Sequence, residues 1–398
     1  MKILYFSYGG GHANIVRMLY KGIEKKQQDE QKIVALTVSW LMFEEDNIPY
    51  VRLSDYAHCI KDWDKIIEIG RRLAEHVDFL NPDLLYEDYC AYLGIGYYCL
   101  LDQYGEEKAK ELYAELGRKA FCPVKIVKQI LAYEKPDVVV ITCGVRIEKA
   151  AGIAANELGI PVIRIADLPE FEPSGCKCIT CVMNDYAKIF TTTVLNENPD
   201  RVYVTGQPVF EDNLIIDEDI NKKVIQDLSL SKFTKLLIYL EEPGLPETTF
   251  VENELFAMSV EHNDWLFIIK QHPNQNEVMR NGLRDNVIFL KKYPLKYLLY
   301  NCDLAITKYS TAGLEAVLLD KTLINIEFSP LVLDFSKFGI SYKVQEKGNF
   351  RQAIYECLNT NSQVYRDLQK RRILFKNKPN AVDNIYQVIE THVIKGNQ

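Results

Sequence analysis

"KILYFSYGGGHANIVRMLYKGIEKK", residues 2–26, decides the fold class. Its first seven residues form an apolar run typical of a buried strand, and apolar residues then recur at helical spacing from residue 13 onward. The glycines at 9–11 provide the turn between them. Because a strand followed at once by a helix opens a β-α-β unit, the stretch predicts an α/β protein with a parallel sheet.

The same alternation of strand and helix continues along the chain and restarts in its second half. We therefore expect two facing Rossmann-like, doubly wound domains with a cleft between them, at residues 1–207 and 208–398. The last helix is free to pack back on the first domain. The expected strands span 32–40, 136–142, 160–167, 188–193 and 201–209, then 235–244, 264–274, 286–290, 302–310 and 322–328; helices are expected at 61–79, 106–133, 146–159 and within 350–395.

The composition is that of an ordinary globular protein, with 398 residues, 47% hydrophobic and 26% charged. A net charge of −8 disfavours nucleic acid as a partner. No apolar run is long enough to predict a transmembrane helix, and the N-terminal run predicts a first strand rather than a signal peptide. The ten cysteines are scattered, which is typical of a reduced, cytoplasmic protein.

The turn after the first strand contains Gly10, Gly11 and His12. Glycines let the backbone approach a ligand and expose N–H groups at a helix N-terminus, and a histidine can act as a base or a donor near neutral pH. The spacing is not G-x-G-x-x-G, and no acidic residue follows the second strand where a ribose partner is expected, which disfavours a nicotinamide cofactor. The alternative is a tight turn with an inert histidine.

"TKYSTAGLEAVLLDKTLINIEF", residues 307–328, contains the best candidate for a diphosphate site. Ser310 and Thr311 are good N-cap residues for a helix over 312–320, and the free N–H groups at such an N-terminus suit a diphosphate. Glu315 lies near the first turn, where its carboxylate can accept hydrogen bonds from ribose hydroxyls. The alternative is a capped helix in which Glu315 only complements the helix dipole.

Two further pairs of candidate residues lie at or just after predicted strands, in the second half of the chain or at the domain junction. Lys270 and His272 in "FIIKQHPNQN" provide a cation and an imidazole that can neutralise phosphate charge. Gly206 and Gly244 lie in turns where a phosphate or an acceptor can approach the backbone closely. An exposed polar loop and two plain turns are the alternatives.

The segment after the strand at 160–167 carries acidic side chains and thiols. Asp167 or Glu170 can act as a general base that activates an acceptor hydroxyl, or they belong to a solvated acidic loop. The loop "GCKCITC" places Cys176, Cys178 and Cys181 close together, so they are candidate ligands for a structural zinc ion. A reduced thiol loop is the alternative, because no second pair has the usual spacing.

The tyrosine-rich stretch at residues 86–105 contains no lysine or arginine. Such a stretch can line an acceptor pocket or contact a lipid-linked acceptor. We favour a helix pair that packs in the core or at a dimer contact.

These motifs resemble the GT-B superfamily of nucleotide-sugar enzymes, over nearly the whole chain at the level of architecture. "GGGH" (9–12) resembles the glycine-rich loop of lipid-II-forming and diacylglycerol glycosyltransferases. "HPNQN" (272–276) and the stretch at 286–316 resemble the C-terminal half of UDP-N-acetylglucosamine 2-epimerases and CDP-glycerol glycerophosphotransferases.

The resemblance implies site roles as well as a fold. It places His272 and the Ser310–Thr311 turn on the diphosphate and Glu315 on the ribose hydroxyls. The epimerases carry an arginine in the first loop, and this chain has none between Tyr5 and Asn14. That difference favours group transfer over epimerisation.

We therefore expect an inverting GT-B glycosyltransferase of glycan or cell-envelope biosynthesis. It would use a nucleotide-sugar donor, most simply a UDP-sugar, without a required metal, and a glycan or lipid-linked acceptor. The alternatives are a UDP-N-acetylglucosamine 2-epimerase or nucleotide-sugar hydrolase, and a non-catalytic nucleotide-sugar-binding protein. Homodimer formation and peripheral contact with the inner face of the membrane stay open.

Overall fold

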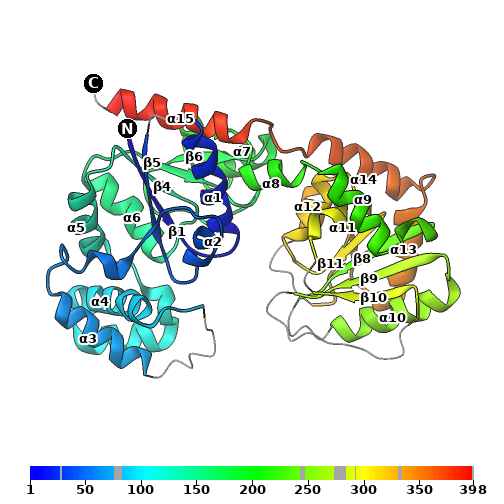
Figure 1. Cartoon of the computed structure of the whole chain (residues 1–398), viewed down its shortest axis with the longest axis horizontal. Helices are drawn as coiled ribbons and strands as arrows, with labels where there is room; N and C mark the ends of the chain where they lie inside the picture. Colours follow the sequence, from blue (N-terminus) through cyan, green and yellow to red (C-terminus); the bar gives the residue numbers. More distant parts are fainter. Residues whose placement is uncertain are drawn as a thin grey trace. The chain divides into compact units, whose positions relative to one another are not determined.

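The computed structural model describes residues 1–26, 29–75, 83–242, 247–272, 284–291, 293–329 and 334–396. The chain divides into two compact units. Unit 1 consists of Met1–Glu211 together with Asn377–Gln398, and unit 2 consists of Asp212–Lys376. The division thus falls a few residues after Gln207, and the C-terminal helix belongs to unit 1 (Figure 1).

Unit 1 is built on a parallel sheet with strand order β3-β2-β1-β4-β5-β6-β7. Side chains alternate between the two faces, so each face has its own hydrophobic core. The strands are β1 (Lys2–Ser7), β2 (Glu30–Ala35), β3 (Val51–Arg52), β4 (Val138–Ile141), β5 (Val162–Ile165), β6 (Ile179–Val182) and β7 (Val202–Val204).

Helices cover both faces of this sheet (Figure 1). One core contains side chains of α1, α2 and α15, and the other contains side chains of α3 to α6. The helices are α1 (Gly11–Glu24), α2 (Trp40–Glu45), α3 (Trp63–Ala74), α4 (Tyr86–Leu116), α5 (Val124–Glu134), α6 (Arg146–Glu157), α7 (Asp185–Thr193), α8 (Pro208–Asn213) and α15 (Ala381–Gly396). In the described part of the chain, no helix combines the length and the apolar character that crossing a bilayer requires.

Unit 2 is built on a second parallel sheet, with strand order β10-β9-β8-β11-β12-β13. The two sheets confirm the predicted α/β class. The strands are β8 (Lys235–Leu240), β9 (Trp265–Lys270), β10 (Val287–Leu290), β11 (Leu304–Thr307), β12 (Thr322–Ile326) and β13 (Tyr342–Val344); the helices are α9 (Glu218–Asp227), α10 (Glu247–Glu261), α11 (Leu295–Asn301), α12 (Ala312–Leu318), α13 (Phe350–Leu358) and α14 (Gln363–Leu374).

The strand predicted at 188–193 is wrong, because these residues belong to α7. Asn184 caps the helix by accepting a hydrogen bond from the N–H of Ala187, and Thr191 donates its hydroxyl proton back to the carbonyl of Ala187. These local bonds stabilise a helix although threonines favour strands. The strand that pairs with β5 is instead β6, which overlaps the second half of the predicted cysteine loop.

The tyrosine-rich stretch is the first part of α4, and its side chains are mostly buried against α3 and α5. The two helices α3 and α4 approach closely at two glycines. A Cβ on Gly70 would overlap the carbonyl oxygen of Cys90, and a Cβ on Gly94 would overlap the carbonyl oxygen of Ile66. Backbone atoms therefore meet directly at this crossing, which supports the core-packing interpretation of the stretch.

We expect Gly70→Ala to destabilise unit 1 by about 1–3 kcal/mol, because the added methyl group would force two backbones apart. Urea unfolding, followed by hydrogen exchange of α3 and α4, measures the effect. Glu68→Ala on the exposed face of the same helix is the matched control and should change stability by less than about 0.5 kcal/mol. Equal effects of the two substitutions would contradict the close crossing.

Candidate functional site

The carboxyl edge of the unit 1 sheet brings two of the predicted catalytic residues together. His12 is the second residue of α1, and Asp167 follows β5. The Nε2 of His12 lies 3.9 Å from an Oδ of Asp167, and both side chains are between a quarter and a third exposed. The Nδ1 of His12 is buried without a hydrogen-bond partner among the described residues. The pair therefore places an imidazole beside a carboxylate at a surface that solvent reaches.

Glu170, the other predicted base, has a different partner. Its carboxylate accepts a hydrogen bond from the hydroxyl of Tyr186 at 2.8 Å, which ties it to α7. The side-chain amide of Gln207 donates to the main-chain carbonyl of Asp167 at 3.4 Å and so supports the loop that carries this carboxylate. The geometry favours Asp167 over Glu170 as the partner of His12.

Glu148 is a residue that the sequence reasoning missed. It is the third residue of α6, and its side chain is completely buried. It lies between the neighbouring strands β1 and β4, whose following helices pack on opposite faces of the sheet. Its carboxylate accepts the backbone N–H groups of Tyr8, Thr142 and Cys143 at 3.2, 2.6 and 2.8 Å. Glu148 therefore fixes the segment that leads into the glycine turn.

Arg146 adds a cation at the same edge. Its φ of 50° lies in the left-handed region, which is strained for a non-glycine residue. The guanidinium carbon lies 4.2 Å from the centre of the Tyr8 ring, and the Tyr8 hydroxyl accepts the N–H of Ile147. An arginine at the start of the helix that follows a buried strand is a signal that the sequence reasoning could have used.

The predicted ligand-binding glycines differ in their surroundings. Gly10 has a φ of 69°, and a Cβ on Gly10 or Gly11 would meet no heavy atom within 4 Å, so one side of the turn is open. Gly206 has a φ of 86°, and a Cβ there would overlap the carbonyl oxygen of Lys378, so packing within unit 1 already accounts for this glycine. Gly244 lies outside the described residues.

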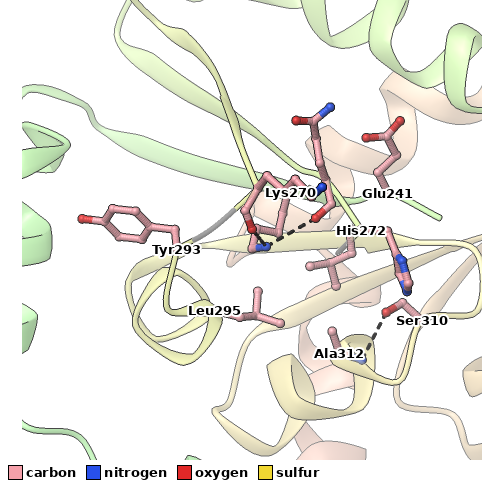
Figure 2. A pocket seen from close by; sticks show the side chains of 10 residues that line it. Glu241, Lys270, His272, Tyr293, Leu295, Ser310 and Ala312 are labelled. Atoms are coloured by element: carbon pink, nitrogen blue, oxygen red, sulfur yellow. Dashed lines mark hydrogen bonds between the residues drawn. The ribbon is translucent and has the colours of Figure 1, made fainter. Parts of the chain in front are cut away.

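Unit 2 contains a cavity of about 470 Å³ at the carboxyl ends of β8 and β9 (Figure 2). The structure brings the predicted residues Lys270, His272 and Ser310 together there. Lys270 donates from Nζ to the carbonyls of Lys291 at 2.6 Å and Gln271 at 3.4 Å, and burial lowers the pKa of Lys270. The lining residues are Leu240, Glu241, Lys270, Gln271, His272, Lys291, Tyr293, Leu295, Ser310 and Ala312.

The turn between β11 and α12 is already occupied by an acidic side chain. One carboxylate oxygen of Glu242 accepts the N–H groups of Tyr309 and Ser310 at 3.0 and 2.7 Å and the hydroxyl of Thr307 at 2.6 Å. The N–H groups of residues 309 and 310 are therefore not free, which counts against the diphosphate site predicted at the Ser310–Thr311 turn. The sequence reasoning missed Glu242 because its partners are distant in the chain.

The other predicted residues of this turn lie at the margin of the cavity. Thr311 precedes α12 without a side-chain capping bond, whereas the Oγ of Ser310 accepts the N–H of Ala312 at 3.4 Å. Thr311 and Glu315 are not among the described residues that line the cavity. Burial raises the pKa of Glu315 to about 7. This carboxyl group therefore changes its charge near neutral pH.

The three thiols predicted to bind zinc do not form one site. Cys178 belongs to the core on the α6 face of the sheet, and Cys176 packs against that core. Cys181, in β6, belongs to the core on the opposite face. Among the described residues no group of three histidines, cysteines or carboxylates suits a metal ion. The zinc prediction is wrong because strand alternation separates Cys181 from the other two.

Comparison with known proteins identifies the architecture. No known family model matches the chain, and no curated protein sequence matches it. Solved structures do match along nearly the whole chain. The fold is the GT-B fold.

Three of the similar structures illustrate the range of GT-B proteins. UDP-GlcNAc 2-epimerase from Neisseria meningitidis, bound to UDP-GlcNAc, has a TM-score of 0.63 at 14% identity and covers 99% of this chain and 100% of its own. The S. aureus MnaA–UDP structure has a TM-score of 0.63 at 13% identity, with 99% and 97% covered. The glycosyltransferase SnogD from Streptomyces nogalater has a TM-score of 0.53 at 14% identity, with 100% and 99% covered. These similarities confirm the predicted GT-B fold.

Glu315 generates a prediction about pH. Because its pKa is raised from 4.5 to about 7 in the folded state, the stability it contributes is full below pH 4.5 and is lost as the pH rises through 7. Relative to wild type, Glu315→Gln should therefore gain about 1–3 kcal/mol between pH 5 and pH 8. Urea unfolding of unit 2 at several pH values measures this gain. Glu346→Gln, at an exposed position, is the control. If the free energy of unfolding depended on pH in the same way in both variants, the raised pKa of Glu315 would be contradicted.

Proposed function

We propose that the chain is a GT-B glycosyltransferase that transfers a sugar from a nucleoside-diphosphate donor to an acceptor hydroxyl. The observation that carries the proposal is the unit 2 cavity, in which Lys270, His272 and Lys291 gather at the carboxyl ends of parallel strands. This edge is where doubly wound sheets bind nucleotides. Two similar structures hold UDP or UDP-GlcNAc, which supports a UDP-sugar as the donor.

The cations of the cavity, rather than the turn before α12, are the proposed diphosphate contacts. Glu242 already accepts the N–H groups of Tyr309 and Ser310, and a phosphate would be repelled by that carboxylate. Lys270 and His272 supply positive charge or hydrogen-bond donors that stabilise the departing diphosphate. Glu315 stays the proposed partner of the ribose hydroxyls, in its ionised form.

Unit 1 is the proposed acceptor-binding unit. The His12 imidazole would take the proton of the acceptor hydroxyl, and the Asp167 carboxylate would stabilise the imidazolium that forms. The acceptor oxygen then bonds to the anomeric carbon as the bond from that carbon to the diphosphate oxygen breaks, and the nucleoside diphosphate leaves with the electron pair. One displacement of this kind inverts the anomeric centre.

Epimerisation of UDP-GlcNAc is the second candidate, favoured by the similarity to 2-epimerases. The resemblance implies an arginine in the first loop of the epimerases, and this chain has none between Tyr5 and Asn14. Incubation with UDP-GlcNAc alone separates the candidates, because an epimerase forms the 2-epimer without an acceptor. A binding protein without catalysis would bind the nucleotide and leave every UDP-sugar unchanged.

We expect Lys270→Met to weaken binding of UDP about 10- to 100-fold, because the variant loses a buried cation of the cavity. Isothermal titration with UDP measures the dissociation constant. Lys337→Met, at an exposed position of unit 2, is the matched control and should bind as wild type does. If wild type binds none of UDP, CDP, GDP and dTDP, the nucleotide-sugar proposal fails altogether.

We expect His12→Gln to lower kcat by about 10²- to 10⁴-fold while the affinity for UDP stays unchanged. Release of UDP from UDP-sugars, with and without a glycan acceptor extract, gives the rate, and titration gives the affinity. His58→Gln, at an exposed position of unit 1, is the control. Full activity of the His12 variant would contradict a catalytic role for the imidazole. It would not contradict donor binding by unit 2.

A further inference from the structure

Unit 1 contains a cavity of about 350 Å³ at the amino edge of its sheet. The first residues of β5 and β6, Val162 and Ile179, line it, and so does Arg201, which directly precedes β7. His12 and Asp167 follow their strands and therefore lie at the opposite, carboxyl edge. The cavity is thus separate from the candidate site of unit 1.

Three side chains that can carry a positive charge line this cavity, namely Lys177, Arg201 and His392. No aspartate or glutamate is among the described residues that line it. In the described part of the chain neither Lys177 nor Arg201 has an ion-pair partner. Because the chain has 55 acidic and 47 basic residues, a shortage of acids does not explain this. The cavity therefore has a local positive charge that attracts anions.

The acidic residues nearest to the lining residues along the chain have other partners or point elsewhere. Glu157, the last residue of α6, forms an ion pair with Lys128. Glu197 accepts the hydroxyl of Thr180 at 2.6 Å. Asp200 is exposed and is not among the residues that line the cavity. An anion from outside would therefore meet no competing carboxylate on the cavity wall.

The C-terminal end of α6 borders the cavity, and a helix C-terminus also attracts cations. Its last carbonyl groups, however, already accept backbone N–H groups. The N–H groups of Leu158 and Ile160 bond to the carbonyl of Ala155 at 3.1 and 2.8 Å. The N–H of Gly159 bonds to the carbonyl of Asn156 at 3.2 Å. The helix end therefore does not require the cations as hydrogen-bond donors.

Neighbouring groups hold the three cationic residues in place. The side chain of Asn156 bonds to both the N–H and the carbonyl of Lys177, at 2.7 and 2.8 Å. The Nε of Arg201 donates to the backbone carbonyl that precedes β6 at 3.2 Å, and its terminal nitrogens make no hydrogen bond within the described residues. The Nε2 of His392 lies 3.1 Å from the hydroxyl of Tyr203. Such positioning before binding lowers the entropy that a ligand must overcome.

We propose that this cavity binds a small phosphomonoester, a ligand distinct from the donor and the acceptor of the proposed function. The terminal nitrogens of Arg201 and the ammonium group of Lys177 hold the phosphate oxygens, and His392 is the third polar contact. A phosphomonoester carries nearly two negative charges near neutral pH, so it matches two cations better than a carboxylate does. The apolar side chains of Ile160 and Ile179 line the same cavity and contact the carbon skeleton of the ligand.

Calorimetric titration of the full chain with glucose 6-phosphate, at constant ionic strength, tests the proposal. We expect wild type to bind it, and Lys177→Gln to bind it at least tenfold more weakly, because a charged hydrogen bond is lost. The Lys177 side chain is exposed, so the substitution leaves the fold intact. Inorganic phosphate should compete with glucose 6-phosphate, and glucose should not. Lys119→Gln, at another exposed position of unit 1, is the matched control and should bind within about twofold of wild type.

The unit 2 cavity is the competing phosphate site, so Lys270→Met is titrated as well and should bind glucose 6-phosphate as wild type does. The ligand should also slow hydrogen exchange in residues 156–162 and 177–181. The proposal is overturned if wild type does not bind, if Lys177→Gln binds as wild type does, or if Lys270→Met loses the binding. It is also overturned if acetate competes as well as inorganic phosphate. A failure of UDP to bind would contradict the proposed function and not this site.

Discussion

A buried carboxylate at the switch point of each sheet is the interaction on which both candidate sites depend. Where neighbouring parallel strands send their helices to opposite faces, backbone N–H groups just past the strand ends are left without a strand partner. Glu148 accepts three of them between β1 and β4, and Glu242 accepts those of Tyr309 and Ser310 beside β8 and β11. Removing either carboxylate would leave buried donors unsatisfied.

These carboxylates also occupy backbone N–H groups that could otherwise bind an anionic ligand. An N–H cluster at a strand end normally attracts anions, but here the chain's own acid takes that place. The diphosphate contacts proposed for unit 2 are therefore side chains of the cavity, Lys270 and His272. In unit 1, Glu148 holds the approach to the glycine turn, and the opposite side of that turn stays open at Gly10 and Gly11. Binding by side chains can be tuned by substitution more readily than binding by backbone.

The sequence predicted the fold class well, because buried parallel strands and amphipathic helices differ in period. It also named His12 and Asp167 as separate candidates, and the structure places them side by side because both follow strands of one sheet. It could not predict Glu148 or Glu242, because their partners are set by strand order rather than by spacing. The helix at α7 was missed since Asn184 and Thr191 act through local hydrogen bonds that hydrophobic periodicity does not register.

The loop between β5 and β6 carries the carboxylate that lies beside His12. It begins at Asp167, beside His12, and ends at Cys178, where β6 starts. Both ends are anchored in a sheet, so the loop can change shape only between them. Gln207 holds the carbonyl of Asp167, and Asn156 holds Lys177. These two contacts restrict the conformations available to the loop, and the Asp167 carboxylate beside His12 shares that restriction.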